Sequence, residues 1–319
     1  MTINSRQLAL VADLGGTHVR VALSDCGQLH ARQIENTVQE GAGAVVQQIA
    51  RMAQHCITSC EPRTPDVLVI ACPGPLDVVT GIVYQPPNMV GWGDVPLGSL
   101  LEQALGLEIV LVNDANAAAY GEWTHGAGVG TRWFVYITVS TGIGAGLVFD
   151  GHLLTGVRGV AGELGHICID PNGPICGCGN RGCLEALASG TAIARRYNEL
   201  AGSVREQIAH SDTGPGPATA ADVAAAAAAG EPLSSRVFDE AATALGIGVA
   251  NIVQLCNPEV VVLGGGVSLA GAMLFERVRR VVDANVIAIA AESVKIVPAA
   301  LGDHAGLMGC AALASVAPA

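Results

Sequence analysis

The sequence predicts an α/β protein built from two lobes. Short apolar segments typical of strands open both halves of the chain, and segments with helical spacing follow each set. The chain has 319 residues, 50% of them hydrophobic, which is enough to bury more than one core. Glycine-rich turns directly follow several of the expected strands, so we expect ligands to bind at strand ends.

The first half is expected to begin with a hairpin. An apolar strand at 8–13 precedes an alternating strand at 18–24, with a third strand near 29–35. The spacing of Val45 and Ile49 belongs to an amphipathic pattern that predicts a helix over 42–60. The remaining elements of this half are a strand at 66–71, a helix at 97–105, a strand at 108–112 and a helix at 116–123.

The second half repeats this order. A strand at 133–139 runs into a glycine loop, and a second hairpin is expected over 146–150 and 152–154. Residues 158–185 are rich in Gly and Cys and read as a loop, and the polar stretch 202–218 reads as a surface excursion. The other expected elements are helices at 185–200, 220–229, 233–256, 269–283 and 304–315, with strands at 259–263 and 294–297.

These elements suggest where the two domains divide. We expect an N-terminal α/β domain over residues 1–115, completed by the C-terminal helix at 304–319. The second α/β domain would then span residues 116–303 and carry a metal-binding loop at 162–185.

Charge and hydropathy exclude several classes of protein. A formal net charge of −12 repels phosphate backbones, so no nucleic-acid partner is expected. The longest apolar runs are too short to span a bilayer, and the N-terminus lacks the features of a signal peptide. We therefore expect a cytoplasmic protein without a membrane partner, in which cysteines stay reduced or bind metal.

The first glycine loop, residues 13–17 (DLGGT), lies between two expected strands. Its glycines let the backbone approach a phosphate closely, and consecutive N–H groups can bind an anion. Asp13 offers an oxygen ligand for Mg²⁺, directly or through water. An ordinary hairpin turn with a capping Asp would explain the same residues.

Two more glycine loops follow strands in the second half. The second glycine loop spans residues 140–146 (STGIGAG), and the third spans residues 264–266 (GGG). The second loop is not a P-loop, because no Lys-Ser/Thr pair follows it, and it fits the dinucleotide fingerprint poorly, because a strand and not a helix is expected to follow. One such turn is weak support for a ligand. Three turns at strand ends, spread over the two halves of the chain, favour a bound nucleotide.

Asn113 and Asp114 lie where a strand gives way to a helix. Capping of that helix by Asp114 or Asn116 explains the polar residues without any function. A general base is the other interpretation, because phosphoryl transfer to an alcohol needs a carboxylate near the attacking hydroxyl. The residues alone leave both interpretations open.

His166, Cys176, Cys178 and Cys183, here called the Cys-His cluster, give the strongest signal. One imidazole and three thiolates form a closed tetrahedral set suited to structural Zn²⁺, and the glycines between them let a short loop wrap around an ion. Free buried thiols are the alternative, and the spacing of Cys168 suggests that it points away. Glu163 and Glu185 flank the cluster, either as solvated charges or as ligands for the hydroxyls of a polyol.

Together these motifs resemble the ROK family of sugar kinases and sugar-responsive repressors. The resemblance covers nearly the whole chain, from Asp13 to about Leu313. Its motifs are DLGGT at 13–17, NDANAAA at 113–119, STGIGAG at 140–146, GELGH at 162–166, CGCGNRGCLE at 176–185 and LGGG at 263–266.

The resemblance implies an actin-like, hexokinase-like (ribonuclease H-like) fold, in which two α/β domains close over ATP and sugar in an interdomain cleft. It implies that Asp114 is the catalytic base and that Asp13 lies near Mg²⁺. The implied sugar contacts are Asn88, Asn113, Asp114, Glu163, His166 and Glu185. The implied ATP contacts are Asp13, Gly15, Gly16, Thr17, Thr141, Gly142, Gly144, Gly264, Gly265 and Gly266. The implied zinc ligands are His166, Cys176, Cys178 and Cys183.

The function implied is an ATP-dependent hexose kinase acting on the 6-hydroxyl of glucose. An N-acetylmannosamine kinase is the main alternative, favoured by the phrases ITVSTG, LLTG and NGPICGCG, whereas Glu163 in GELGH favours glucose. Fructokinase remains open. A sugar-sensing regulator without turnover is disfavoured, because only about seven residues precede the first strand and repressor members carry a DNA-binding segment there. A homodimer or homotetramer is expected from the family.

Overall fold

The structure is a computed structural model that describes residues 8–59, 62–208 and 216–316. The chain forms two compact units, each described here by itself. The first unit comprises Met1–Gly130, Gly146–Gly162 and Ala300–Ala319, and the second comprises Thr131–Ala145 and Glu163–Ala299.

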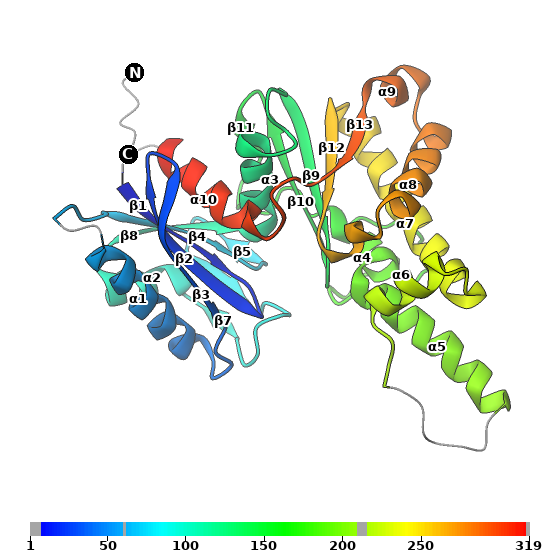
Figure 1. The fold of residues 1–319 in the computed structure, drawn as a ribbon, viewed down its shortest axis with the longest axis horizontal. Helices are drawn as coiled ribbons and strands as arrows, with labels where there is room; N and C mark the ends of the chain where they lie inside the picture. Colours follow the sequence, from blue (N-terminus) through cyan, green and yellow to red (C-terminus); the bar gives the residue numbers. More distant parts are fainter. Residues whose placement is uncertain (1–7, 60–61, 209–215, 317–319) are drawn as a thin grey trace. The chain divides into compact units, whose positions relative to one another are not determined.

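A five-stranded sheet with the order β3-β2-β1-β4-β8 forms the centre of the first unit (Figure 1). The hairpin expected from the sequence is present: β1 (Leu8–Leu14), β2 (His18–Asp25) and β3 (Gln28–Asn36) pair antiparallel in succession. On the other side of β1, β4 (Val67–Cys72) and β8 (Glu108–Asn113) continue the sheet in parallel.

Helices cover both faces of this sheet. Successive residues of β1 enter different cores, because side chains alternate across a strand. Leu10 enters a core that includes residues of α1 (Ala42–Thr58) and α2 (Leu97–Leu105). Val11 enters a second core, which includes residues of α10 (Ala305–Val316).

Helix α3 (Asp114–His125) packs directly against α10, which changes the expected domain boundary. A Cβ at Gly121 would lie 2.3 Å from the carbonyl oxygen of Ala305, and one at Gly309 would lie 1.7 Å from that of Ala117. The two backbones therefore touch through glycine. This contact places α3 in the first unit, and the chain first leaves this unit after Gly130, whereas the expected division lay between residues 115 and 116.

Glu122 holds two distant segments of the first unit together. Its side chain is fully buried, and its carboxylate accepts hydrogen bonds from the backbone N–H of Ala127 at 2.9 Å, Ala300 at 2.9 Å and Leu301 at 2.7 Å. Main-chain donors thus satisfy this buried charge, as burial of a carboxylate requires. Nothing in the local sequence pattern pointed to this role.

A small antiparallel sheet of β5 (Leu76–Asp77), β6 (Ile82–Tyr84) and β7 (Asp94–Val95) also belongs to the first unit. It was not expected, because strands this short show no usable periodicity. The buried carboxylate of Asp77 pairs with Arg158, which ties residues 154–162 to this sheet.

The second unit contains most of a sheet with the order β11-β10-β9-β12-β13. The expected strands are present as β9 (Trp133–Val139), β12 (Val260–Gly264) and β13 (Lys295–Pro298), with β12 parallel to both neighbours. Strand β10 (Ile143–Phe149) begins earlier than expected and continues into β11 (His152–Leu153). Part of the second glycine loop is therefore strand.

Helices follow in the expected order, with some changes at their ends. Helix α5 continues through residues 202–208, where a surface excursion was expected; residues 209–215 lie outside the described part. The expected loop at 158–185 contains a short 3-10 helix, η1 (Leu164–His166), and the start of α4. The helices of this unit are α4 (Leu184–Ala188), α5 (Gly190–Ile208), α6 (Ala220–Ala228), α7 (Pro232–Cys256), α8 (Ala272–Asn285) and α9 (Ala288–Ser293), with η2 at Gly266–Ala270.

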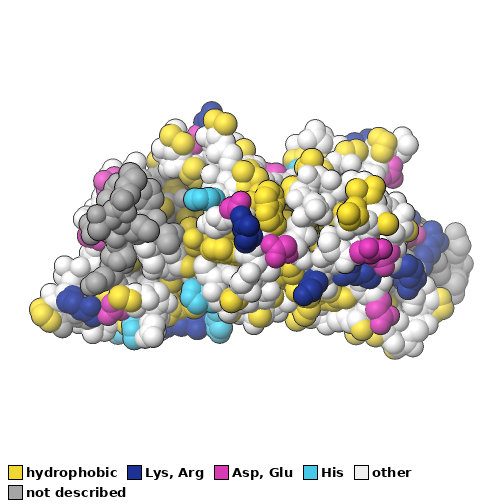
Figure 2. Space-filling model, turned by 90° about the horizontal axis from the view of Figure 1, so that it is seen from above, with side chains coloured by type: hydrophobic (Ala, Val, Ile, Leu, Met, Phe, Trp, Pro, Cys, Tyr) yellow, Lys and Arg dark blue, Asp and Glu magenta, His cyan; other side chains and the backbone are white. Residues whose placement is uncertain are grey.

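The surface mixes charged and apolar side chains. On the face seen in Figure 2, acidic, basic and hydrophobic groups are interspersed. Among the described residues, no helix combines the length and apolar character that crossing a membrane would need.

Candidate functional site

The carboxyl ends of three parallel strands bring the predicted residues of the first unit to one edge of its sheet. Asp13 of β1 lies opposite Ala71 of β4, and Cys72 of β4 lies opposite Asn113 of β8. Ligands of α/β sheets bind beyond the carboxyl ends of strands. Asp13, Asn113 and Asp114 therefore occupy the part of the sheet where a ligand is expected.

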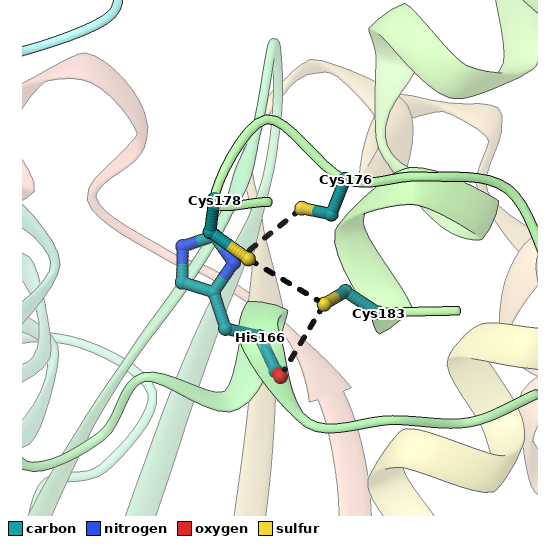
Figure 3. A group of neighbouring side chains, drawn as sticks. All are labelled: His166, Cys176, Cys178 and Cys183. Atoms are coloured by element: carbon teal, nitrogen blue, oxygen red, sulfur yellow. Dashed lines mark hydrogen bonds between the residues drawn. The ribbon is translucent and has the colours of Figure 1, made fainter. Parts of the chain in front are cut away.

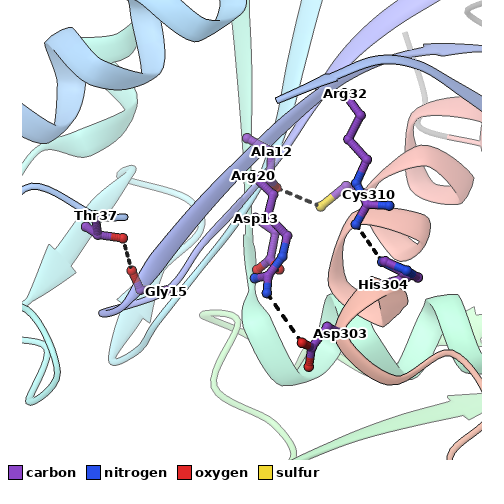
Figure 4. A network of polar contacts seen from close by, with 9 residues as sticks. All are labelled: Ala12, Asp13, Gly15, Arg20, Arg32, Thr37, Asp303, His304 and Cys310. Atoms are coloured by element: carbon purple, nitrogen blue, oxygen red, sulfur yellow. Dashed lines mark hydrogen bonds and ion pairs between the residues drawn. The ribbon is translucent and has the colours of Figure 1, made fainter. Parts of the chain in front are cut away.

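Asp13 belongs to a network of charged groups that Figure 4 shows in detail. Arg20, its cross-strand neighbour on β2, donates to the carboxylate at 3.3 Å and lies 3.8 Å from Asp303. Burial raises the pKa of Asp13; the Arg20 charge and hydrogen bond oppose that rise, and the Asp303 charge adds to it. A Cβ at Gly306, in the first turn of α10, would lie 3.0 Å from the carboxyl carbon, so glycine there leaves the group room.

The first glycine loop is held by neutral groups of the first unit. Gly15 donates to the His18 carbonyl at 2.9 Å, and the buried hydroxyl of Thr37 donates to the Gly15 carbonyl at 2.7 Å. A Cβ at Gly16 would lie 2.3 Å from the Asn88 carbonyl oxygen, so the loop and the segment carrying Asn88 are in backbone contact. The structure thus brings two of the predicted sites, Gly16 and Asn88, together.

Asn113 and Asp114 open helix α3, with a change in their expected capping roles. Asn113, not Asp114 or Asn116, is the N-cap: its side-chain oxygen accepts from the N–H of Ala115 at 3.0 Å and of Asn116 at 3.2 Å. An extended backbone at the last residue of β8 suits the N-cap position. Asp114 is exposed in the first turn and accepts from Ala115 N–H at 2.8 Å.

Two polar residues of this region were missed from the sequence. Arg20 fits the alternation of polar and apolar residues in strand β2 (HVRVALSD), so the pattern alone did not single it out. Asn116 was considered only as a cap, yet it is buried, and within the described part of the chain its Oδ1 has no hydrogen-bond partner. An unpaired buried acceptor is costly, which marks Asn116 for attention beside the base candidate.

The second glycine loop contacts Glu185 within the second unit. The Ile143 N–H donates to Glu185 Oε2 at 2.9 Å, and a Cβ at Gly142 would lie 2.5 Å from the same oxygen. The other end of the loop is also bonded, since Gly190 N–H donates to the Ser140 carbonyl at 2.7 Å. Thr141 is exposed at the tip, and Gly144 lies in β10.

The third glycine loop has a packing explanation for two of its residues. A Cβ at Gly264 would lie 2.4 Å from the Tyr136 hydroxyl, and one at Gly265 would lie 2.4 Å from the Val139 carbonyl oxygen. Gly265 also has a φ of 81°, which disfavours other residues. A Cβ at Gly266 would meet no described atom within 4 Å, so packing among the described residues does not require glycine there.

The structure brings all four members of the Cys-His cluster together (Figure 3). Their candidate ligand atoms all lie within 4.8 Å of one another. His166 ends η1, and Cys183 is the N-cap of α4. The turn between them requires glycine, because a Cβ at Gly182 would lie 1.6 Å from the Asp170 carbonyl oxygen. Cys168 is exposed and lies outside this group.

The donor set fits a divalent, thiophilic cation. His166 Nδ1 lies 3.6 Å from Cys176 Sγ, and the Sγ atoms of Cys178 and Cys183 are 3.7 Å apart. Burial raises the pKa of Cys183 to about 12 and also raises that of Cys176. These two thiols are protonated near neutral pH, whereas hydrogen bonds, first from the Asn180 backbone, lower the pKa of Cys178. Binding of a cation would release the protons of the thiols.

The imidazole of His166 also faces away from the cluster. Its Nε2 lies 3.8 Å from Glu163 Oε2, while Nδ1 faces Cys176. Partial burial of the carboxyl raises the pKa of Glu163; the His166 charge opposes the rise, and the Glu185 charge adds to it. The side chains of Glu163 and His166 are therefore neighbours.

The sequence matches one family profile and several known proteins. The ROK family profile matches residues 10–317. A glucokinase of Thermotoga maritima is 37% identical over 303 residues, which cover 94% of this chain and 95% of that protein.

Solved structures with a similar fold include sugar kinases of the ROK family. The ROK hexokinase from Thermus thermophilus matches with a TM-score of 0.81 and 37% identity, over 97% of both chains. A ROK family glucokinase from Streptomyces griseus, in complex with glucose and AMPPNP, matches with a TM-score of 0.78 and 33% identity, over 96% of this chain and 98% of that one. The predicted actin-like, hexokinase-like fold class is confirmed by these matches.

Proposed function

Because this chain belongs to the ROK family, we propose that it is an ATP-dependent hexose kinase that phosphorylates the 6-hydroxyl of glucose. The observation that carries the proposal is the register of β1, β4 and β8, which sets Asp13 and Asn113–Asp114 at one edge of a sheet. One carboxylate on the phosphate side and another for the hydroxyl are the groups that phosphoryl transfer to an alcohol needs.

Asp114 would act as the general base. Its carboxylate is exposed at the N-terminus of α3, and the Ala115 N–H orients it. It would accept the proton of the attacking hydroxyl as the new O–P bond forms and the bond from the γ-phosphorus to the bridging oxygen breaks. ADP is then the leaving group.

The glycine loops would hold the nucleotide. Backbone N–H groups at Gly16 and Thr17, and at Thr141, Gly142 and Gly144, suit phosphate oxygens. Gly15, whose own N–H is bonded to the His18 carbonyl, would let the backbone approach the phosphates closely. Gly264, Gly265 and Gly266 would lie on the adenosine side. Asp13 fits the usual Mg²⁺ site of one carboxylate plus substrate phosphates. When bound, Mg²⁺ neutralises charge on the phosphate oxygens.

The sugar would be held by hydroxyl contacts to acidic and polar groups. Glu163, Glu185 and the Nε2 edge of His166 would contact ring hydroxyls, as would Asn88 and Asn113. The Glu163–His166 pair, 3.8 Å apart, supports this assignment because two oriented groups discriminate between hydroxyl configurations.

The Cys-His cluster would hold structural Zn²⁺. Three thiolates and one imidazole fill a tetrahedral shell, so a metal bound there supplies bracing and no reactive position. His166 would be oriented by its Nδ1 contact with the cluster, which leaves Nε2 toward Glu163.

A coupled assay with ATP and a panel of hexoses tests the proposal. We expect the highest kcat/KM with glucose. If N-acetylmannosamine were the best substrate, the protein would still be a kinase, but the proposed sugar would be wrong. Binding of sugars without turnover of any would leave the non-catalytic regulator instead.

Asp114→Ala tests the base assignment. We expect kcat to fall about 10²–10⁴-fold while glucose affinity, measured by calorimetry, stays within a few-fold of wild type. Asp66→Ala removes another exposed carboxylate of the same unit and should leave kcat unchanged. Turnover at the wild-type rate by Asp114→Ala would refute the assignment.

A further inference from the structure

Glu185 contacts two parts of the second unit that the proposed function keeps separate. Its Oε2 accepts from the Ile143 N–H of the second glycine loop at 2.9 Å, and its Oε1 lies 3.9 Å from Sγ of Cys176 in the Cys-His cluster. A carboxylate has enough lone pairs to serve both neighbours and a sugar hydroxyl. One side chain thus lies between the metal-binding residues and the phosphate-binding residues.

The covalent path to the cluster is also short. Glu185 is the second residue of α4, and Cys183 is the N-cap of that helix. The buried side chains of Cys176, Cys183 and Ala186 form a small core beneath it. The position of the carboxylate therefore depends on the cluster that anchors the start of α4.

The loop itself is built around this carboxylate. Glycine at position 142 admits it, since a Cβ there would lie 2.5 Å from Oε2. The bond from Gly190 N–H to the Ser140 carbonyl, at 2.7 Å, holds the other end of the loop to the same α4–α5 segment. Both ends of the phosphate-binding turn are thus bonded to the segment that follows Cys183.

We propose that Glu185 is a positioning residue that couples the Cys-His cluster to the second glycine loop, so that loss of the cluster weakens nucleotide binding even without sugar. The inference rests on the proposed nucleotide role of that loop. The proposed coupling is separate from the role of Glu185 as a sugar contact. It concerns the affinity for the nucleotide, measured without sugar.

The test measures the Kd of AMPPNP with Mg²⁺ and without sugar by calorimetry, together with bound zinc by metal analysis. We expect Cys176→Ala to lose zinc and Glu185→Ala to keep it, each raising the Kd about tenfold. The double variant should be no weaker than either single one, because both changes break the same connection. Additive effects, or an unchanged Kd in zinc-free Cys176→Ala, would overturn the coupling.

Two further variants separate positioning from charge and from misfolding. Glu185→Gln keeps an oxygen for the Ile143 N–H, so its Kd should stay within about twofold of wild type; a Kd as weak as that of Glu185→Ala would contradict a positioning role. Gly142→Ala keeps the cluster and its zinc but displaces the carboxylate, so its Kd should rise, and a wild-type Kd would contradict the proposal.

A matched control removes a neighbouring thiol. Cys168→Ala lies outside the cluster and should change neither zinc content nor Kd, and a loss of either would contradict the proposed path. Failure of the wild-type protein to bind AMPPNP would instead count against the proposed kinase function, so the two failures are distinguishable.

Discussion

The first and second glycine loops are held by different kinds of contact. The first loop is held by backbone groups and neutral side chains. The Thr37 hydroxyl donates a hydrogen bond to the Gly15 carbonyl, and the Asn88 backbone contacts Gly16. The second loop is fixed by a carboxylate, Glu185, which Gly142 admits.

The first loop is therefore held by rigid groups, and the second by a side chain that can move. The backbone of a strand end cannot move aside when a neighbouring residue gains an atom, whereas a glutamate side chain can change rotamer. The first loop should therefore resist change until the sheet itself is strained. The second should respond to the state of the residues that carry Glu185.

Among changes to the supports of the first loop, the largest effect is expected from Gly16→Ala. The new Cβ would lie 2.3 Å from the Asn88 carbonyl oxygen, so backbone must move. We expect the free energy of unfolding to fall by about 1–3 kcal/mol, as for other overpacked sites. The melting temperature and kcat/KM for ATP should both fall, the latter at least about tenfold because the phosphate-binding turn is displaced.

Gly43→Ala is the control for this change. Position 43 is in helix α1, and an added Cβ there meets nothing within 4 Å, so both quantities should stay at or above wild type. A Gly16→Ala protein with a wild-type melting temperature would show that the first loop is as adjustable as the second.

The sequence predicted the parts of each loop that local chemistry determines. The strands before the loops follow from apolar runs, and the Cys-His cluster follows from the metal preference of thiolate and imidazole. The assignment of ligand donors to strand ends also needed no coordinates, because parallel strands share an edge.

What the sequence did not predict depends on contacts between distant residues. Ile143 and Glu185 are 42 residues apart, and neither shows by its own pattern that it binds the other. No pattern in the sequence shows that Gly121 and Gly309 let α3 and α10 touch, a contact that places α3 in the first unit.

A smaller effect is expected from Thr37→Val. The change keeps the shape of a buried side chain but removes the hydroxyl that donates to the Gly15 carbonyl at 2.7 Å. Loss of one hydrogen bond should cost about 1 kcal/mol and lower the melting temperature by a few degrees. The KM for ATP should rise a few-fold, with kcat little changed.

Thr58→Val provides the comparison. Thr58 also donates to a carbonyl, that of Gln54, but on an exposed helical turn, so we expect no measurable change in melting temperature or KM. Equal effects of the two substitutions would mean that the Thr37 bond does not hold the first loop.

The smallest effect concerns a charged pair that supports the strand before Thr37. Hydrogen bonds from Arg51 and then Gln48 lower the pKa of Glu35 to about 2. The folded pKa is below the unfolded value of about 4.3, so ionised Glu35 stabilises the fold above that value. This stabilisation is lost as pH falls through the folded pKa. It should be below about 1 kcal/mol, because Arg51 is 63% exposed.

Glu35→Gln should therefore be slightly less stable than wild type at pH 7, with a gap in melting temperature that narrows from about pH 5 downward. Added salt should narrow the gap at pH 7 as well, because the pair lies at the surface. A gap that stays constant from pH 7 to pH 3 would show that Glu35 acts through packing and not through charge. In that case only neutral groups would stabilise the first loop, whereas the carboxylate of Glu185 holds the second.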